Sequence, residues 1–268
     1  MVTAAPHELV IGAATHALVL ENWSIPNESY RERVNPLHEI AAYGPVIGKA
    51  ETFFAALRAV TGVETGYGQV IARPRGWGDR WMAWLPHIYV VATRGYPDHL
   101  ENFGWLRTPP KLTEPACKEV GQLFRNLVNL PKLSLAAKRL NAAFLRRDEE
   151  DSILDVTIAL ESLLVSDSKS EITHRLAMRV AALCKLEPFE DYTPEKVFWA
   201  CKRIYDFRSA VAHGGKHVEK SRIIKVAEQK ELRAVRLGID LLRHIVRSLC
   251  KRPEYLQAEK LDNFLLSN

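Results

Sequence analysis

A chain of 268 residues, 47% hydrophobic and 26% charged, can bury a core of its own, which excludes a chain that is disordered throughout. Its length allows one large domain or two small ones. The formal net charge is +5, and the excess lies in the C-terminal third, where Lys202 to Glu254 holds fourteen Lys or Arg against six Asp or Glu. A basic region of this kind indicates an anionic partner such as a nucleic acid, with an ordinary solvated basic surface as the alternative.

The four cysteines lie far apart in the sequence and form no CxxC pair, which argues against a zinc ribbon or a redox pair. Each lies in an apolar helical context, so we expect four small core residues in a reducing cytoplasm. They are Cys117, Cys184, Cys201 and Cys250.

The apolar run over 9–20 has no basic leader and carries Glu8 and His16 at or within it, so it makes a poor signal peptide. No stretch approaches the roughly 18 uninterrupted apolar residues of a membrane span. We therefore expect a cytoplasmic protein without a membrane partner.

The first part of the chain mixes short elements. Residues 8–20 favour a short helix or an apolar strand, and periodicity does not decide between them. A polar loop follows over 22–36. Helical spacing then predicts a helix over 46–60, because Gly44 and Pro45 interrupt the pattern in front of it.

Two runs rich in β-branched and aromatic residues, 67–73 and 81–93, predict a hairpin joined by a loop at 74–79. Pro86 places part of the second run at an edge or a bulge. Aromatic rings beside basic groups can stack nucleic-acid bases, although packing within the hairpin is the simpler interpretation. The residues concerned are Trp77, Trp81, Trp84 and Trp105, with Arg73, Arg75 and Arg80 near them.

Residues 95–115 contain four prolines and are typical of a linker, and the pattern from Ala116 onward is almost wholly helical. We predict helices over 116–129, 132–147, 150–166, 170–186, 194–213 and 222–251, with Pro131 and Pro194 in first turns and Gly214-Gly215 ending the fifth helix. The sequence thus predicts a mainly α protein. A mixed α+β region of unknown role spans 1–112, and a helical bundle spans 113–268.

An arginine and a histidine five positions apart, Arg208 and His213, stand just before the glycine pair. In a helix, Arg208 falls in the apolar row that contains Cys201 and Ile204, so its charge needs an anionic partner. Five residues advance a helix by about 7.5 Å and turn it by roughly 100° each, which puts Arg208 and His213 on different sides. They can border one cleft if a second element, or a second copy of the protein, closes over the helix end.

Two further sets of charged residues have both a structural and a functional interpretation. Glu161 lies in an apolar helical stretch, so it needs a cation such as Arg208, Arg175 or Arg179, either in a structural ion pair or to hold Arg208 toward a phosphate. In the last predicted helix, a charged stripe follows one face and forms either a solvated surface or a phosphate track. The stripe consists of Arg233, Arg236, Asp240, Arg243 and Arg247.

Metal and nucleotide chemistry find little support in the sequence. His213 and His217 are four apart, but the glycines between them argue against one helix, and no acidic ligand is adjacent. No GxGxxG or GxxxxGK[ST] segment and no Ser/His/Asp grouping is present. We expect no metal and no cofactor.

The R-x4-H element Arg208–His213, followed by two glycines, resembles that of HEPN-domain proteins, and its flanks look like the Apea-like branch of that superfamily. The resemblance covers about 130–250, roughly half the chain. The flanking segments are LAAKRL at 135–140, EDSILD at 150–155, IALESLL at 158–164, EITHRL at 171–176, RVAA at 179–182 and IYDFRS at 204–209.

The resemblance implies a helical bundle that forms a homodimer, in which two R-x4-H elements face one composite groove. Many HEPN members are metal-independent endoribonucleases in defence, toxin or stress systems. Arg208 would then hold the scissile phosphate and His213 would act as general base or acid on the 2′-hydroxyl and the leaving oxygen, with Glu161 and Ser209 as orienting residues. Residues in reach of an RNA strand would be Lys216, Arg233, Arg236, Arg243 and Arg247.

One position departs from the family pattern: many nucleolytic HEPN domains carry Asn, Asp or His where this chain has Ser209. The superfamily also includes members that only bind. A non-catalytic module that binds RNA, a nucleotide or a partner protein is therefore the alternative, and the antitoxin or scaffold half of a two-gene system is a third. In the ribonuclease role, residues 1–112 would sense a trigger, contact a regulatory protein or position RNA.

Overall fold

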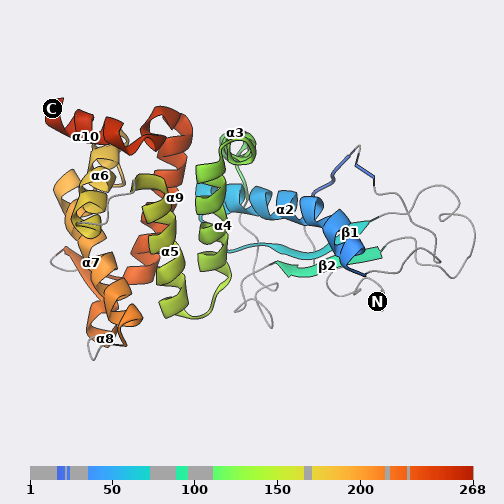
Figure 1. Cartoon of the computed structure of the whole chain (residues 1–268), viewed down its shortest axis with the longest axis horizontal. Helices are drawn as coiled ribbons and strands as arrows, with labels where there is room; N and C mark the ends of the chain where they lie inside the picture. The colour runs from blue at the N-terminus through green and yellow to red at the C-terminus, as the bar shows by residue number, and fades with distance from the viewer. Residues whose placement is uncertain are drawn as a thin grey trace, which may run out of the picture. The chain divides into compact units, whose positions relative to one another are not determined.

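Helical spacing dominates the sequence, and the computed structural model of the chain is mainly helical (Figure 1). It describes residues 17–21, 23–24, 36–72, 89–95, 111–165, 171–214, 218–227 and 230–267. Contacts divide the chain into two compact units, one within Met1–Glu51 and Thr65–Thr108, the other within Thr52–Glu64 and Pro109–Asn268. The helical unit therefore begins close to the predicted domain boundary at 113 and also takes the end of an N-terminal helix.

In the first unit, helix α2 (Pro36–Thr61) runs through Gly44 and Pro45. The prediction of a break at this point is wrong. Proline removes one main-chain hydrogen bond and costs about 3 kcal/mol in a helix interior. The helix continues nevertheless, and its last turns are buried in the second unit through Ala55, Ala56 and Ala59.

Strands β1 (Tyr67–Ala72) and β2 (Tyr89–Gly95) pair antiparallel, as the β-branched runs predict. Gln69 lies opposite Thr93, and the register shifts between Val70 and Ile71. The connecting loop, Pro86 and the tryptophans and arginines of the hairpin lie outside the described residues, as do residues 8–16 and most of the predicted linker. Residues 17–21 form neither helix nor strand.

The second unit is built on five successive helices, and all but α6 begin at a side-chain cap or a proline. They are α3 (Glu114–Asn129), α4 (Pro131–Leu145), α5 (Glu149–Leu164), α6 (Ile172–Leu186) and α7 (Pro194–Ala212). The side chains of Thr113, Asp148 and Thr193 accept hydrogen bonds from main-chain N–H groups of the first turns that follow them. Pro131 and Pro194 occupy first turns, as predicted.

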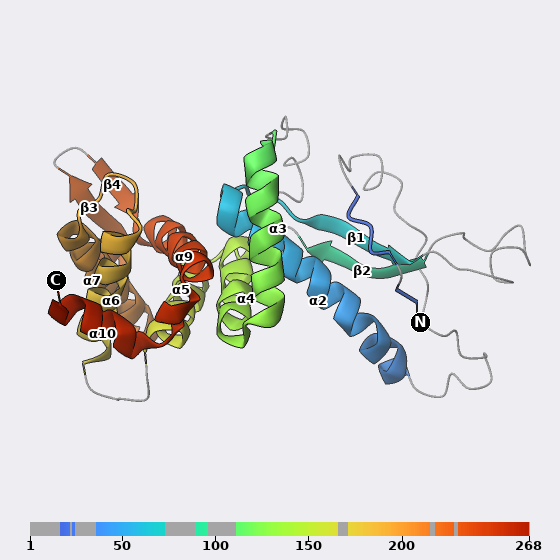
Figure 2. The ribbon, with the colours of Figure 1, turned by 90° about the horizontal axis from the view of Figure 1, so that it is seen from above.

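The predicted helix over 222–251 is wrong in its first third. A short helix α8 (Val218–Ser221) leads into an antiparallel pair, β3 (Ile223–Ala227) and β4 (Lys230–Arg233), and helix α9 (Ala234–Lys251) begins only afterwards. A 3₁₀ turn over Pro253–Leu256 and helix α10 (Ala258–Ser267) complete the chain. The β3–β4 pair is visible beside α7 and α9 in Figure 2.

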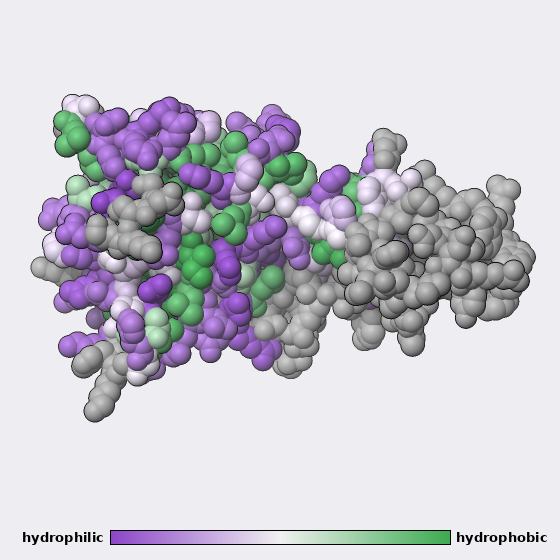
Figure 3. Space-filling model, in the orientation of Figure 1, coloured by the Kyte–Doolittle hydropathy of each residue, from purple (hydrophilic) through white to green (hydrophobic). Residues whose placement is uncertain are grey.

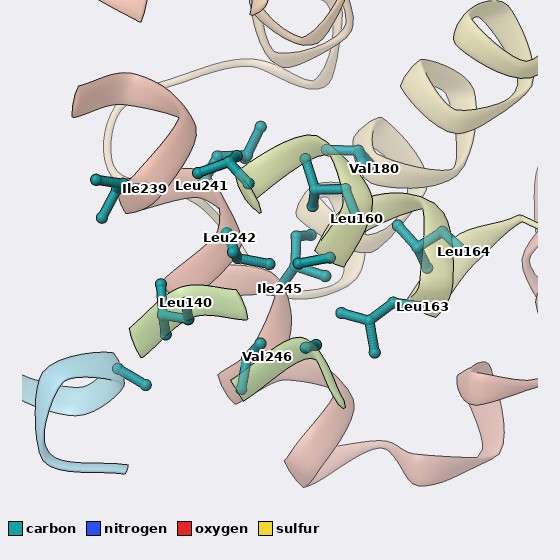
Figure 4. Close-up of a cluster of buried hydrophobic side chains, with 14 of the residues drawn as sticks. Leu140, Leu160, Leu163, Leu164, Val180, Ile239, Leu241, Leu242, Ile245 and Val246 are labelled. Atoms are coloured by element: carbon teal, nitrogen blue, oxygen red, sulfur yellow. The ribbon is translucent and has the colours of Figure 1, made fainter. Parts of the chain in front are cut away.

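The core of the helical unit lies between α4, α5, α6 and α9. Figure 4 shows Leu140 of α4, Leu160 of α5 and Val180 of α6 gathered with Leu242 and Ile245 of α9, and all five are fully buried. Helices α5 and α9 approach closely at Gly238, where an added Cβ would lie 3.1 Å from Val156. The core therefore fixes α5 and α9, and α7 packs on both of them.

The surface of the helical unit is mostly hydrophilic in the view of Figure 3, with scattered apolar patches. Cys184, Cys201 and Cys250 are buried as predicted, whereas Cys117 is exposed, so that part of the prediction is wrong. Cys117 lies in the first turn of α3, on the side that faces solvent. Among the described residues, no helix is both long enough and apolar enough to cross a lipid bilayer.

Candidate functional site

Helix α7 carries the Arg208–His213 element in its last turns and presents Arg208 on its inner side. Val197, Cys201 and Ile204 are fully buried, so the apolar row of the sequence is the core face of the helix. Arg208 continues this row and is half-buried. Its stem is therefore held among apolar groups while its guanidinium lies near the edge of the core.

A hydrogen-bonded pair lies next to Arg208. The hydroxyl of Tyr205, a buried residue, donates to Oε1 of Glu161 over 3.1 Å and joins α7 to α5. Burial raises the pKa of Tyr205, and the Glu161 carboxylate raises it further, while the positive charge of Arg208 lowers it. The phenol therefore stays protonated and occupies the carboxylate as a donor, with Arg208 close enough to affect its charge state.

Arg208 itself is left with an unmet requirement. Its Nε is buried and has no hydrogen-bond partner in the structure, and among the described residues no carboxylate forms an ion pair with this side chain. An unpaired polar group on a buried cation is costly, because the protein does not replace the hydrogen bonds that water gave it. An anion that approached the guanidinium would remove this cost.

His213 and Ser209 lie on the opposite, solvent side of the helix end. His213 is the C-cap residue of α7, its side chain is exposed, and its main-chain N–H donates to the carbonyl oxygen of Ser209 over 3.1 Å. Ser209 is also exposed. At roughly 100° per residue, Arg208 and His213 point about 140° apart. One copy of α7 therefore does not bring both groups to one atom.

The charged stripe predicted as a phosphate track has protein partners in the structure. Arg233 pairs with Glu149 at 2.6 Å, Arg236 with Asp240 at 2.9 Å, and Arg247 with Glu119 at 2.7 Å. Arg233 and Arg236 keep more than half of their side-chain surface exposed, and Arg247 a third of it. Lys216 and His217 lie outside the described residues.

Arg243 has a role that sequence reasoning missed. Its Nε donates to the carbonyl oxygens of Arg58 and Ala59, at 2.9 and 3.2 Å, and its Nη1 pairs with Asp240 at 2.8 Å. A cation on the last carbonyl groups of a helix completes their hydrogen bonds and offsets the negative end of the helix dipole. Arg243 therefore holds the end of α2 against α9. The two segments are far apart in the sequence, so no local pattern predicts this contact.

The partners offered for Glu161 in the sequence also differ from those found. Arg179 is buried and donates to both oxygens of Asp262 and to the carbonyl oxygen of Leu164. Tyr205 takes the place beside Glu161, and the sequence reasoning passed over it. The signal that pointed to it was its position three residues before Arg208, which places both side chains on neighbouring parts of one helix face.

Within the described residues, no group of three or more His, Cys, Asp or Glu side chains could hold a metal ion. Comparisons of the chain with family models, with curated proteins and with solved structures find no match.

Proposed function

We propose that this protein is a metal-independent endoribonuclease in which Arg208 binds the scissile phosphate and His213 transfers protons. One observation carries the proposal: Arg208 is a half-buried cation whose buried Nε has no hydrogen-bond partner among the described residues, while Oε1 of Glu161 accepts a hydrogen bond from Tyr205. A guanidinium in this state can bind an anionic ligand that is not part of the chain. The basic C-terminal third and the resemblance of the Arg208–His213 element to HEPN ribonucleases favour an RNA phosphate as that anion.

The chemistry needs no group beyond these side chains and the RNA. The 2′-hydroxyl oxygen attacks phosphorus while a neutral His213 accepts its proton, and the bond from phosphorus to the 5′-oxygen breaks. A protonated histidine donates the proton that the leaving oxygen takes up. Arg208 stabilises the charge that develops on the phosphate oxygens. The products are a 2′,3′-cyclic phosphate and a 5′-hydroxyl end.

A homodimer would resolve the divergence of Arg208 and His213 on one helix. In a two-fold pair, His213 of one copy can face Arg208 of the other, and two histidines can divide the acid and base roles. Ser209, exposed beside His213, would then orient the substrate, and Glu161 with Tyr205 would orient Arg208. We propose a role in defence or as a toxin for such an enzyme, with the N-terminal unit as the part that responds to a trigger.

The exposed arginines define where RNA would extend beyond the reacting phosphate. Arg233 and Arg236 expose 64% and 52% of their side-chain surface, so a phosphate can reach them without breaking the core. Arg243 exposes 15% and is bound to main-chain carbonyls, which makes it a structural residue. We therefore place the RNA contacts at Arg233 and Arg236, and we place Arg247 at the edge of the surface that RNA would contact.

The test is a cleavage assay with purified protein and mixed RNA in the presence of EDTA. Wild type should produce 5′-hydroxyl ends, and both Arg208→Ala and His213→Ala should lose at least about a hundredfold in rate. Arg125→Ala is the matched control, since Arg125 is an exposed arginine of another helix, α3. Circular dichroism must show that all variants are folded.

The proposal is contradicted if wild type yields no cyclic phosphate with any RNA, or if all four proteins cut equally. RNA binding without cleavage, lost in Arg208→Ala, would instead support the non-catalytic binding module. The oligomeric state of wild type, measured by sedimentation, tests the dimer separately. A monomer that cleaves RNA would remove the composite groove from the mechanism.

A further inference from the structure

The outer face of α7 carries an aromatic and cationic cluster that the proposed reaction does not use. Trp199 exposes 53% of its surface, and the neighbouring Phe198 ring meets it edge-on at a centroid distance of 5.3 Å. The ammonium group of Lys202 lies over both rings, 5.2 Å from that of Trp199 and 5.7 Å from that of Phe198. A tryptophan so exposed beside a cation is an uncommon surface feature.

An open hollow of about 400 Å³ lies against this cluster. Its lining is shared with the cluster, because Lys202 belongs to both and His174 meets the Phe198 ring at 5.4 Å. Glu171, Ile172 and Thr173 at the beginning of α6 form the rest of the wall. Helices α6 and α7 lie side by side, as both ribbon views show (Figures 1 and 2), so the hollow belongs to a pair of packed helices.

The side chains of the hollow match the parts of a nucleotide. Lys202 offers an ammonium to a phosphate, and Trp199 offers an aromatic face to a base. The Glu171 carboxylate can accept hydrogen bonds from a ribose hydroxyl or from an amino group of a base, and His174 can exchange hydrogen bonds with either. The volume of the hollow lies within the range of sites that hold small molecules.

We propose that Trp199, Lys202 and the hollow beside them form a stacking subsite for one nucleotide of single-stranded RNA. The inference rests on the proposed function for the identity of the ligand. The subsite takes unpaired RNA, because a base inside a duplex cannot lie on an exposed tryptophan. A platform of this kind accepts any base, so it distinguishes single-stranded from duplex RNA more strongly than it distinguishes one base sequence from another.

The subsite and His213 belong to one side of α7. Trp199, Lys202, Asp206, Ser209 and His213 follow one another at steps of three or four residues, and all but the half-buried Lys202 are exposed. Lys202 and His213 are eleven residues apart, which separates them by about 16 Å along the helix and by only about 20° around it. Asp206 lies between them, with Arg203 at 3.4 Å to balance its charge. A strand that stacks on Trp199 can therefore continue along this side to the reacting phosphate near His213.

Binding of a short fluorescently labelled single-stranded RNA tests the subsite without requiring cleavage. We would measure anisotropy with the full chain, in EDTA, in a His213→Ala background that prevents cutting. Trp199→Ala should bind about 5- to 150-fold more weakly, which is the range that loss of one stacked base produces, and Trp199→Phe should recover most of the affinity. Lys202→Ala should also bind more weakly, and its dependence on salt should fall by about one ion.

Val128→Ala is the control for loss of an exposed apolar side chain, since Val128 exposes 56% of its surface and lies on another helix, α3. It should leave the affinity unchanged. Duplex RNA of the same sequence should bind more weakly than the single strand and should not respond to Trp199→Ala.

Each result separates the subsite from the proposed reaction. Equal affinity of Trp199→Ala and its parent would overturn the subsite even if wild type cuts RNA. RNA binding that depends on Trp199, in a protein that cuts no RNA, supports the subsite and contradicts the reaction. A change of oligomeric state in Trp199→Ala with unchanged affinity would assign the cluster to contact between copies and overturn the subsite, and absence of RNA binding by wild type overturns both.

Discussion

The guanidinium of Arg179 is buried in the helical unit and is held by the carboxylate of Asp262, with Nε–Oδ1 and Nη2–Oδ2 distances of 2.8 and 2.6 Å. This bidentate contact attaches α10 to α6, and the third donor of the guanidinium meets the carbonyl oxygen of Leu164 at the end of α5. One side chain thus joins three helices. This contact stabilises the position of α10, because a buried guanidinium that loses its carboxylate partner is costly in free energy.

Asp262→Ala should therefore destabilise the helical unit by about 2 kcal/mol, since the Asp262 side chain is partly exposed and water can replace part of its contact. Urea unfolding, followed by circular dichroism, measures the change. Glu259→Ala, at an exposed position of the same helix, should alter stability by less than about 0.5 kcal/mol. Equal stability of the two variants would show that Arg179 does not depend on α10.

The end of α2 gives a second prediction. Gly62 has a φ of 67°, and a Cβ added there would lie 2.6 Å from Nη1 of Arg243, which is held by the carbonyl oxygens in front of it. Gly62→Ala combines left-handed backbone strain with displacement of this arginine, so it should cost about 1–2 kcal/mol in unfolding free energy. Gly121→Ala in α3, with its nearest neighbour at 3.8 Å, should instead stabilise by about 0.5–1 kcal/mol. The two changes should differ in sign in the same unfolding experiment.

Periodicity in the sequence predicts which face of α7 is buried, because Val197, Cys201 and Ile204 repeat at helical steps. It does not predict the strands at 223–233, whose apolar residues also fit a helix. Arg222, just before β3, and Arg233, at the end of β4, both pair with Glu149, which lies 73 and 84 positions earlier in the sequence. These pairs, and the α9-to-α2 contacts of Arg243, arise from tertiary packing, which overrides local propensity.

The same distinction applies to the candidate site. An arginine in an apolar row predicts a need for an anion, and Arg208 has that position in the structure. Spacing alone could not predict that Tyr205, rather than Arg208, forms a hydrogen bond with Glu161. The pairing depends on how α5 packs on α7, and Glu161 and Tyr205 are 44 positions apart in the sequence. Local pattern therefore identifies which side chains enter a site, and packing determines which of them pair.

A half-buried histidine, His244, makes the stability of the helical unit depend on pH. The Nε2 of His244 lies 2.8 Å from the carbonyl oxygen of Glu187, and burial lowers the pKa of His244, with Arg247 and Lys251 acting in the same direction and Glu187 against it. The folded state thus favours the neutral ring, while the unfolded chain takes up a proton near pH 6.5. Stability is fully present above that pH and decreases as the pH falls below it.

We expect the urea midpoint of wild type to decline between about pH 7 and about pH 5, and His244→Gln to show a flatter dependence over that window. The His244→Gln protein should be less stable than wild type at neutral pH, because glutamine has no ring to contact Phe189. The ring centroids of Phe189 and His244 lie 5.2 Å apart. Parallel curves for the two proteins would assign the pH dependence to other groups. The carboxylate of Glu187, whose pKa is lowered mainly by its hydrogen bond from Arg252, adds a further loss only below about pH 4.5.

The last prediction concerns why Arg208 is available at all. Tyr205 donates to Glu161, and without that hydroxyl the carboxylate would lose this partner and would compete with RNA for Arg208, one turn further along α7. Tyr205→Phe should therefore weaken RNA binding and cleavage about tenfold, the effect of one charge-assisted hydrogen bond gained by a competing partner. Glu161→Gln in the Tyr205→Phe background should restore affinity, because an amide competes poorly for a cation. A double-mutant cycle in which the two changes simply add would show that Glu161 and Arg208 do not compete.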